Sequence, residues 1–297
     1  METKPAGLKV YVALVTAELL WALSFVWYKQ VLIYLPPITL VLFRLVIAVS
    51  ILSVVALFIG KLQKMQRRDL PAFIALSFFQ PFAYFMGESF GMQYVSSTVG
   101  AVVISTIPIF AAIAGFFILK ERLGWINLIG MALSFAGVGL IVFEGAADLN
   151  FKPIGILFLF VAVLAAVGYG LVLLRYIQRY NTFTVIVYQL ALGIVWFLPF
   201  FVIKDLPGLQ SSIFVREMLI PLLELAILCS AVAFLLYIYS VRNVGISRAT
   251  VFANLIPVFT AISAFFILDE KISMQKVLGI LIVIGGLFLS QKKVIRP

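Results

Sequence analysis

Long apolar runs, separated by short polar or charged breaks, recur along the whole chain. Residues 99–119 and 277–289 are almost continuously apolar and are long enough to form helices. A helix that spans a membrane needs about 20 mostly apolar residues. The pattern therefore predicts ten transmembrane helices, at about residues 9–28, 36–60, 70–92, 97–119, 124–143, 153–174, 182–203, 217–240, 247–268 and 274–290.

The apolar runs are continuous, whereas the strands of an outer-membrane barrel alternate apolar and polar residues. The pattern therefore favours an all-α integral membrane protein. Composition agrees, because 64% of the 297 residues are hydrophobic, 11% are charged and the mean hydropathy is +1.18. Ten spans use roughly 200 positions, which leaves no room for a soluble domain. Residues 10–27 carry Glu18 and lack the small-residue cleavage site of a signal peptide, so they are predicted to remain as the first span.

The two halves of the chain repeat each other at a shift of 149 residues. Ten of the fifteen positions are identical between residues 107–121 and 256–270. Glu121 and Glu270, which end these two segments, are expected to cap the adjoining loops. The same shift, without a gap, aligns Pro108 with Pro257, Gly130 with Gly279 and Gly137 with Gly286.

This repeat divides the chain into two units of five predicted spans, residues 1–147 and residues 148–297. Because five is an odd number, the second unit enters the membrane upside down relative to the first. The fold class expected from the sequence is thus ten transmembrane helices arranged as two inverted five-helix repeats. Inverted repeats are typical of secondary transporters, whose substrate sites lie near the bilayer midplane between the two units.

Motifs distributed over both units resemble one known family. Pro108 lies within a span and is followed by small and aromatic residues, by Leu-Lys-Glu-Arg-Leu at 119–123 and by a helix with spaced glycines. The first span carries Trp21-Ala-Leu-Ser-Phe25, and Arg44 precedes a Val-Ile-Ala stretch in the second. With these features the chain resembles, in two copies, the EamA-like transporters of the drug/metabolite transporter superfamily. The resemblance implies a ten-helix inner-membrane carrier of small metabolites, often amino acids or related compounds moved outward, with a central cavity among spans one, three, four, six, eight and nine.

Basic residues are distributed unevenly between the two sets of predicted loops. With both termini placed in the cytoplasm, that side holds about 15 Lys and Arg residues and the other side about 6. Basic residues mark the cytoplasmic side of bacterial membrane proteins. The sequence therefore predicts a multi-pass protein of the bacterial cytoplasmic membrane with cytoplasmic N- and C-termini. The net charge of +10 is then explained without nucleic acid as a partner.

The residue types in the chain argue against several kinds of chemistry. There is no histidine and only one cysteine, Cys229, so we expect neither a histidine proton relay nor a metal cluster nor an internal disulfide. A phosphate-binding loop of the Gly-x-x-x-x-Gly-Lys-Ser/Thr type is not present. The sequence thus predicts a protein that is not an enzyme and that has no cofactor and no metal. Its expected partners are a small-molecule substrate and the lipid bilayer, and the expected assembly is a monomer or a homodimer.

Four ionisable residues lie inside predicted spans: Glu18, Arg44, Glu88 and Glu224. Such a side chain at the bilayer centre costs roughly 2.5–3.5 kcal/mol, so each needs a partner, water or a function. Arg44 and Glu88 fall at similar depth in the outer half, which predicts a pair that is either structural or in contact with substrate or a gate. Glu18 falls near the midplane and could bind a substrate ammonium, carry a coupled proton or form a fixed hydrogen bond to a neighbouring helix. Glu224 lies nearer the outer interface, where we expect it to be solvated.

Further polar and aromatic residues are spaced so that they share helix faces. On the third span, Ser77, Gln80, Tyr84, Glu88 and Gly91 recur three or four residues apart, which predicts one continuous polar stripe along a wet pathway. The repeat-equivalent prolines are expected to bend their helices and to free backbone carbonyls. The predicted substrate-binding or coupling residues are Glu18, Trp21, Arg44, Gln80, Tyr84, Glu88, Ser105, Tyr169, Tyr237 and Asn254, with helix kinks at Pro108 and Pro257.

These features predict a secondary transporter that moves small organic metabolites, amino acids or related compounds, by alternating access, with export as the expected direction. Two other functions stay open. A carboxylate near Trp21 and Tyr84 also suits a drug- or choline-type ammonium carrier, and a lipid flippase would need an apolar lateral groove in place of the polar stripe. Coupling to protons through Glu18 or Glu88 and exchange without a coupling ion both agree with the sequence.

Overall fold

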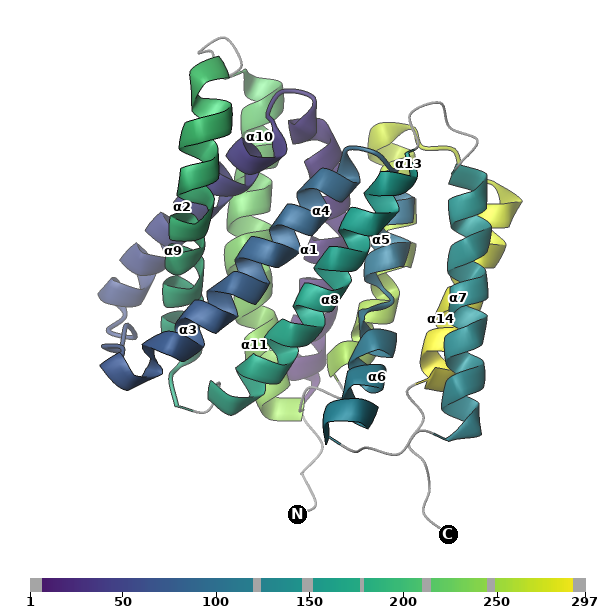
Figure 1. Cartoon of the computed structure of the whole chain (residues 1–297), viewed down its shortest axis with the longest axis horizontal. Coiled ribbons are helices and arrows are strands. Elements are labelled where there is room, and N and C mark those ends of the chain that lie inside the picture. The colour runs from purple at the N-terminus through teal and green to yellow at the C-terminus, as the bar shows by residue number, and fades with distance from the viewer. Residues whose placement is uncertain are drawn as a thin grey trace.

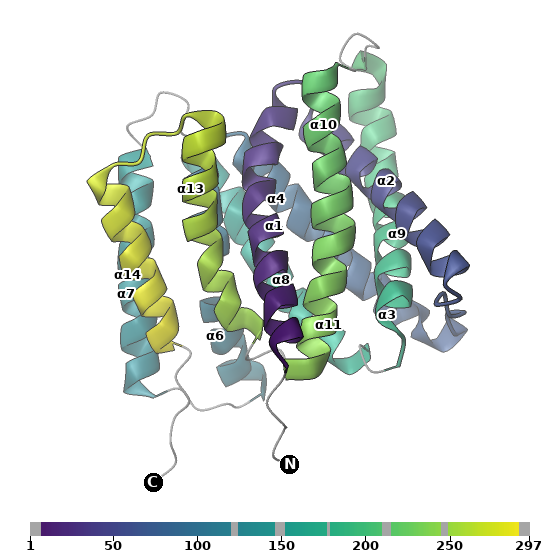
Figure 2. The same cartoon turned by 180° about the vertical axis from the view of Figure 1, so that it is seen from behind.

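The computed structural model describes residues 7–119, 124–145, 152–176, 179–209, 215–244 and 249–290, and within these ranges all regular structure is helical. The helices run back and forth between two ends of the molecule (Figures 1 and 2). The first residues of α1 (Leu8–Leu32) and the last residues of α14 (Met274–Ser290) consequently lie at the same end. The all-α fold class predicted from the sequence is confirmed for the described residues.

The first half of the chain contains the five apolar segments that the sequence predicts there, two of them interrupted. After α1, its elements are α2 (Pro37–Phe58), η1 (Arg67–Asp69), α3 (Leu70–Ser77), η2 (Phe78–Ala83), α4 (Tyr84–Met92), α5 (Ser97–Ile104), α6 (Ile107–Leu119) and α7 (Trp125–Gly145).

The second half shows the same alternation of long and interrupted helices. Its irregular segments are π-helical in η3 and η6 and 3-10 helical in η4 and η7. The elements before α14 are α8 (Pro153–Tyr176), α9 (Thr182–Phe200), η3 (Phe201–Asp205), η4 (Leu206–Gly208), α10 (Arg216–Glu224), η6 (Leu225–Ala233), α11 (Phe234–Val244), η7 (Thr250–Leu255) and α13 (Ile256–Leu268).

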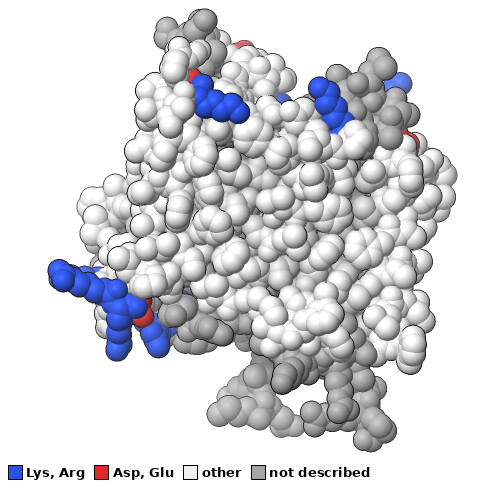
Figure 3. Space-filling model, in the orientation of Figure 1, with Lys and Arg blue, Asp and Glu red and all other residues white. Residues whose placement is uncertain are grey.

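Many of these helices are long and apolar enough to cross a membrane. Within the described residues eight candidate spans meet that criterion, and two shorter apolar helices, Phe252–Leu268 and Met274–Ser290, follow them. Large apolar side chains cover the outer surface, among them Phe58, which is 88% exposed, and Phe143, which is 79% exposed. The face in Figure 3 shows charged side chains near its two ends with an uncharged band between them. Such a surface is expected of helices that face lipid, and the chain is a multi-pass membrane protein.

The third span is not the single regular helix that the sequence predicts. Gln80 has φ −145° and ψ 118°, outside the helical region, and Pro81 follows it. The predicted continuous polar stripe is therefore wrong. Before the interruption in the chain, the Ser77 hydroxyl accepts a hydrogen bond of 3.1 Å from the Trp196 indole. After it, Gly91 packs against α8, so both ends of the predicted stripe contact other helices of the protein.

The fourth and ninth spans are also interrupted, in each case shortly before the repeat-equivalent proline. Pro108 and Pro257 lie in the first turns of α6 and α13, and the irregular residues precede them. Proline fits the first turn of a helix because the N–H it lacks would have no partner there. The two prolines thus lie in the first turn of a new helical segment after each break, and the helix kinks at Pro108 and Pro257 stay a prediction.

Close helix packing joins the two halves at one side of the molecule, where α7 and α14 lie against each other (Figures 1 and 2). A Cβ on Gly130 would lie 2.3 Å from the Ser290 backbone nitrogen and 2.6 Å from the Gly286 carbonyl oxygen. A Cβ on Gly137 would similarly lie 2.8 Å from the Gly279 carbonyl oxygen. The glycines that the repeat aligns in sequence are therefore paired crosswise in space, and they allow the two backbones to approach closely.

Candidate functional site

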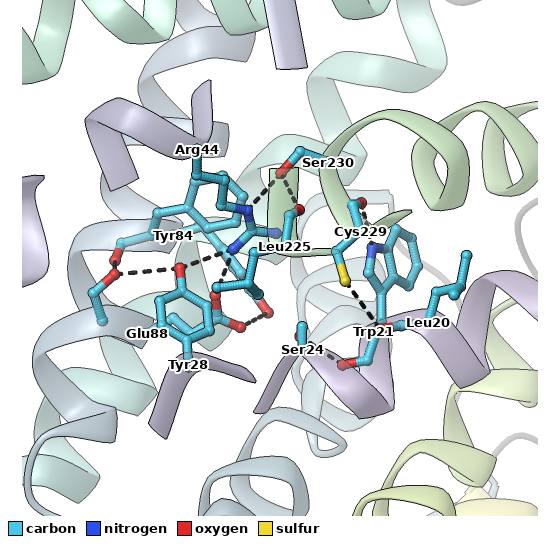
Figure 4. Close-up of polar contacts among 12 residues, drawn as sticks. Leu20, Trp21, Ser24, Tyr28, Arg44, Tyr84, Glu88, Leu225, Cys229 and Ser230 are labelled. Carbon is cyan, nitrogen blue, oxygen red and sulfur yellow. Dashed lines mark hydrogen bonds and ion pairs between the residues drawn. The ribbon is translucent and has the colours of Figure 1, made fainter. Parts of the chain in front are cut away.

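Arg44 is the centre of a buried polar cluster that draws on both halves of the chain. It lies on α2 and is 2% exposed. Its Nε donates a hydrogen bond of 2.5 Å to the Ser230 hydroxyl in η6, and its Nη1 donates one of 2.9 Å to the Tyr28 hydroxyl on α1. The guanidinium carbon lies 4.3 Å from the centre of the Phe85 ring. Figure 4 shows Tyr28 of α1, Glu88 of α4 and Ser230 of η6 gathered around Arg44 of α2.

Glu88 lies beside Arg44, as the depth argument predicts. Arg44 Nη1 and Glu88 Oε2 are 4.0 Å apart, the outer limit of an ion pair, and both side chains are almost fully buried. The Tyr84 hydroxyl donates a hydrogen bond of 3.0 Å to the other carboxylate oxygen of Glu88. Neutral hydroxyls therefore complete the coordination of both charges, which the low dielectric of a buried site requires. Tyr28 and Ser230 are the members of this cluster that the sequence does not single out.

Glu18 lies near the middle of α1 and is fully buried. Neither of its carboxyl oxygens has a hydrogen-bond partner among the described residues. Glu18 thus differs from Arg44 and Glu88, which are also buried but which have polar partners. Burying an ionised carboxyl group without a partner is energetically unfavourable, so Glu18 needs a bound proton or a nearby cation.

Aromatic side chains of α11 pack against the next turn of α1. The ring centres of Trp21 and Tyr237 are 4.9 Å apart, and those of Trp21 and Phe234 are 5.2 Å apart. The Trp21 indole donates a hydrogen bond of 3.3 Å to the Cys229 carbonyl oxygen, and the Cys229 thiol contacts the Leu20 carbonyl oxygen at 3.1 Å (Figure 4). Trp21 and Tyr237, both predicted as pocket rings, are therefore neighbours one turn from Glu18.

Two predicted residues of the second half bring further polar groups into the interior. Tyr169 on α8 donates a hydrogen bond of 3.2 Å to Gln189 Oε1 on α9. Asn254 in η7 is 1% exposed, and neither atom of its amide has a hydrogen-bond partner among the described residues. Gln189 is a residue that the sequence analysis misses, because one glutamine in an apolar span gives no periodic signal.

Ser105 and Gln80 lie at the two helix interruptions of the first half. The Ser105 hydroxyl donates a hydrogen bond of 2.7 Å to the Val102 carbonyl oxygen, and the neighbouring Thr106 hydroxyl donates one of 2.6 Å to Val103. Both hydroxyls are thus satisfied by carbonyl oxygens of their own chain segment. Gln80 is half-buried.

Further contacts join the two halves of the chain at the two ends of the helix bundle. At one end the Asp69 carboxylate forms an ion pair of 2.8 Å with Arg179 and accepts a hydrogen bond of 2.6 Å from the Tyr180 hydroxyl. Burial, followed by the hydrogen bond to Asp69, raises the pKa of Tyr180, so its hydroxyl remains a donor. At the other end, the Thr39 backbone N–H and hydroxyl both donate to Asp205 Oδ2, at 3.0 and 2.7 Å.

Of the two repeat-equivalent acids, Glu121 and Glu270, the structure describes only Glu270. Glu121 lies outside the described residues. Glu270 accepts hydrogen bonds from the Ser97 backbone N–H at 2.8 Å and from the Thr98 hydroxyl at 2.9 Å. It therefore caps the N-terminus of α5, a helix of the other half, and not the adjoining loop that the sequence predicts.

Comparison with known proteins identifies the family to which these helices belong. The model of the EamA-like transporter family matches residues 8–143 and again residues 153–291. The chain belongs to the EamA-like transporter family. The family prediction made from the sequence is thereby confirmed, and membership indicates a transporter in preference to an enzyme.

Relatives of this EamA-like chain carry transporter names. An uncharacterized transporter of Archaeoglobus fulgidus is 29% identical over 289 residues, which cover 96% of this chain and 98% of the relative. The uncharacterized transporter YdfC of Bacillus subtilis is 27% identical over 277 residues, 93% of this chain and 88% of the relative. A protein of known crystal structure matches with a TM-score of 0.69 at 16% identity, over 95% of this chain and 97% of that one, which shows a shared fold.

The two family matches allow the buried groups of this EamA-like protein to be assigned to segments. Arg44, Tyr28 and Glu88 come from the first matched segment and Ser230 from the second. Glu18 and Trp21 come from the first and Tyr237 from the second. Both polar groups are thus built across the boundary between the matched segments. Within the described residues, no group of three or more His, Cys, Asp or Glu side chains is placed to hold a metal ion.

Proposed function

We propose that this EamA-like protein is a secondary transporter that moves a small organic solute with an ammonium group, an amino acid or related compound, by alternating access. The observation that carries the proposal is the isolation of Glu18, a fully buried carboxyl group without a hydrogen-bond partner among the described residues. An ionised carboxylate in such surroundings needs a neutralising partner. A substrate ammonium or a coupled proton supplies that partner, and each can leave again during a transport cycle.

The proposed architecture has ten membrane crossings in two inverted units, residues 1–147 and 148–297. The eight candidate spans, followed by two shorter apolar helices, support this number of crossings. The two family matches, residues 8–143 and 153–291, support a division near the middle of the chain. In inverted-repeat transporters, alternating access arises when one part of the molecule rocks against the other around a central site. Glu18 and Trp21 on α1, which contacts α10, α11 and α13 of the second unit, suit such a site.

We place the protein in the bacterial cytoplasmic membrane with both termini in the cytoplasm. The excess of about 15 basic residues over about 6 supports this orientation. In this orientation the Asp69–Arg179 pair lies on the cytoplasmic side and the Thr39–Asp205 contact on the external side. The proposed direction of transport is export.

A carrier of drug-like or choline-like ammonium compounds is the second candidate function. The observation that favours it is the pair of rings of Trp21 and Tyr237, 4.9 Å apart and one helical turn from Glu18. Aromatic faces bind quaternary ammonium groups by cation–π attraction, and a carboxylate adds charge attraction. The two functions differ in whether the solute must also carry a carboxylate.

Transport by the purified protein in proteoliposomes tests the proposal. Vesicles are loaded with labelled amino acids or with choline, and efflux is measured with and without an imposed pH gradient. We expect Glu18→Gln to insert and to keep its thermal stability while it loses most transport or its response to pH, because the amide keeps the size but carries no exchangeable charge. Glu224→Gln is the matched control, since Glu224 is half-buried at the end of α10.

The proposal fails if Glu18→Gln moves every solute of the wild-type protein at the wild-type rate with an unchanged pH profile. Glu18 would then be a packing residue, and Glu88 would become the site to examine. Amino acids that are exported while choline is not would select the first function over the second. The presence or absence of a pH-gradient effect separates proton coupling from exchange without a coupling ion.

A further inference from the structure

Among the described residues, the guanidinium of Arg44 uses only part of its hydrogen-bonding capacity. Its Nε donates to the Ser230 hydroxyl and its Nη1 donates to the Tyr28 hydroxyl. A guanidinium presents its N–H groups as a planar fork, which matches the two oxygens of a carboxylate. No carboxylate of the described residues lies within hydrogen-bond distance of Arg44. The paired hydrogen bonds that this group forms most favourably are therefore not made.

Aromatic rings fix the orientation of this guanidinium. Its central carbon lies 4.3 Å from the centre of the Phe85 ring and 5.3 Å from that of the Tyr28 ring. Guanidinium groups pack well against aromatic faces, and this contact leaves the N–H groups at the edge available. Arg44 is thus held in place by rings and hydroxyls and not by a carboxylate. A donor that is already ordered loses little entropy when it binds a ligand.

Glu88 balances the charge of Arg44 without using those N–H groups. Its Oε2 lies 4.0 Å from Arg44 Nη1, which is beyond the range of a hydrogen bond. Its Oε1 accepts a hydrogen bond of 3.0 Å from the Tyr84 hydroxyl, one turn earlier on α4 (Figure 4). A carboxylate thus faces the guanidinium but is held by another partner. The stronger, paired geometry is left for a second carboxylate.

The elements around Arg44 come from both halves of the chain. Tyr28, Arg44 and Glu88 lie on α1, α2 and α4, and Ser230 lies in η6 of the second matched segment. Arg44 is 2% exposed, so a ligand can reach it only when these elements move apart. Rocking of one half against the other, as in inverted-repeat transporters, would open this position.

We propose that Arg44 binds the carboxylate of the transported solute, and that Glu88 leaves its position beside Arg44 and takes up a proton when the solute binds. Two ionised carboxylates that face one guanidinium would leave a net negative charge in a buried site, which is unfavourable. The solute is therefore a carboxylate-bearing compound, an amino acid ahead of a choline-like cation. This inference rests on the transport function proposed above, and it adds a binding residue for the solute group that Glu18 would repel.

The surroundings of Glu88 leave a proton as the available counter-charge. The titratable side chains gathered around it are Arg44 of α2, Tyr28 of α1 and Tyr84 of its own helix. The part of α8 that packs against Gly87, residues 158–162, is uncharged, as are α5 and η2. Because Glu88 is ionised beside Arg44 and protonated in the loaded protein, one proton enters with each solute carboxylate. Binding therefore tightens as the pH falls.

Three probes with one branched carbon skeleton test the proposal: leucine, leucinamide, which lacks the carboxylate, and 4-methylpentanoate, which lacks the ammonium group. Binding to the purified full-length protein is measured as ligand-dependent thermal stabilisation over a concentration series. At about pH 6 we expect leucine to bind roughly 10- to 100-fold more tightly than leucinamide, the range of hydrogen bonds to a charged group. This preference should increase about tenfold from about pH 7 to about pH 6, because one proton is taken up.

Glu88→Gln separates this role from that of a purely structural ion pair. The amide leaves Arg44 without a counter-charge, so the empty variant should melt below the wild-type protein. A solute carboxylate supplies that charge, so leucine should restore the lost stability, and the preference over leucinamide should no longer change with pH. Glu224→Gln, which neutralises a half-buried acid at the end of α10, is the matched control and should keep the pH dependence.

A combined variant, Arg44→Gln with Glu88→Gln, serves if Glu88→Gln alone does not fold. It removes both charges together and so avoids an unmatched buried charge. We expect it to bind leucine and leucinamide equally. A preference for leucine that survives in this variant, or no preference in the wild-type protein at either pH, would overturn the role of Arg44. A wild-type preference that does not change with pH would overturn proton uptake by Glu88.

Failure of this inference differs from failure of the proposed function. If leucine and leucinamide bind equally and 4-methylpentanoate does not bind, the ammonium site at Glu18 stands and the role of Arg44 is wrong. If 4-methylpentanoate binds as tightly as leucine, the role of Arg44 stands and the ammonium site is wrong. If none of the three probes binds the wild-type protein, both are wrong.

Discussion

Arg44 on α2 donates a hydrogen bond of 2.5 Å to the Ser230 hydroxyl in η6, and this contact joins the two segments that match the EamA-like family. The Ser230 hydroxyl in turn donates to the Leu225 carbonyl oxygen at 3.1 Å, five residues earlier, as the π-helical geometry allows. The irregularity of η6 therefore places a hydroxyl where it accepts from a buried cation.

Removing the Ser230 hydroxyl should destabilise the protein. In Ser230→Ala the buried Arg44 Nε loses its acceptor, and an unsatisfied buried donor costs about 1–3 kcal/mol. Thermal unfolding in detergent, followed by size-exclusion chromatography, measures the loss. Ser50→Ala is the control, because Ser50 is exposed and its hydroxyl donates to the Val46 carbonyl oxygen of its own helix. Equal stability of the two variants would mean that the Arg44–Ser230 bond contributes nothing.

Arg44 and Glu88 should be energetically coupled despite their separation of 4.0 Å. Arg44→Ala and Glu88→Ala should each destabilise the protein by about 3 kcal/mol, because each leaves an unmatched charge in a buried site. The double variant should lose less than the sum, by about 0.5–3 kcal/mol. Unfolding of all four proteins under identical conditions measures this difference. Strictly additive losses would show that Tyr28, Ser230 and Tyr84 satisfy the two charges separately.

Replacement of Gly130 should disrupt the contact between α7 and α14. In Gly130→Ala the new methyl group would overlap the backbone at Ser290, and overpacking typically costs about 1–3 kcal/mol. Gly139→Ala is the matched control on α7, since the nearest atom to its Cβ would be 4.0 Å away on Phe143. The control should be neutral or slightly stabilising because alanine favours helix. Similar melting temperatures for the two variants would contradict the packing described.

The cap on α5 should contribute measurably to stability. Glu270→Ala removes the acceptor for the Ser97 backbone N–H and the Thr98 hydroxyl, which should cost about 1 kcal/mol. Glu270→Gln should recover part of the loss, since its amide oxygen still accepts. Glu217→Ala, an exposed acid in the first turn of α10, provides the comparison. A loss no greater than that of Glu217→Ala would rule out a structural cap.

Topology reporters test the proposed orientation. Fusions after Lys64 and Arg179 should report the cytoplasm, and fusions after Asp148 and Lys204 should report the exterior. Paired reporters, one active only in the cytoplasm and one only outside, measure both outcomes for each site. An external signal from Lys64 would reverse the orientation and remove the support taken from the basic residues.

The sequence by itself determined the class of the protein and the approximate depth of its charged residues. Insertion into a membrane depends on hydrophobicity summed over about 20 neighbouring residues, which is a local property of the chain. For the same reason Arg44 and Glu88 could be paired from sequence: each depth follows from counting residues along a helix of fixed rise. The motifs around Trp21, Pro108 and Leu119 were enough to indicate the family.

Only the tertiary structure decided how the polar side chains are partnered. The stripe predicted on the third span assumed a regular helix, and the extended backbone at Gln80 rotates one part of that span relative to the other. Ser230, Tyr28 and Gln189 became visible only in their contacts with other helices. Such contacts depend on helix rotation, crossing angle and local interruptions, which are set by packing against the other half of the chain. A local pattern of apolar residues does not contain that information.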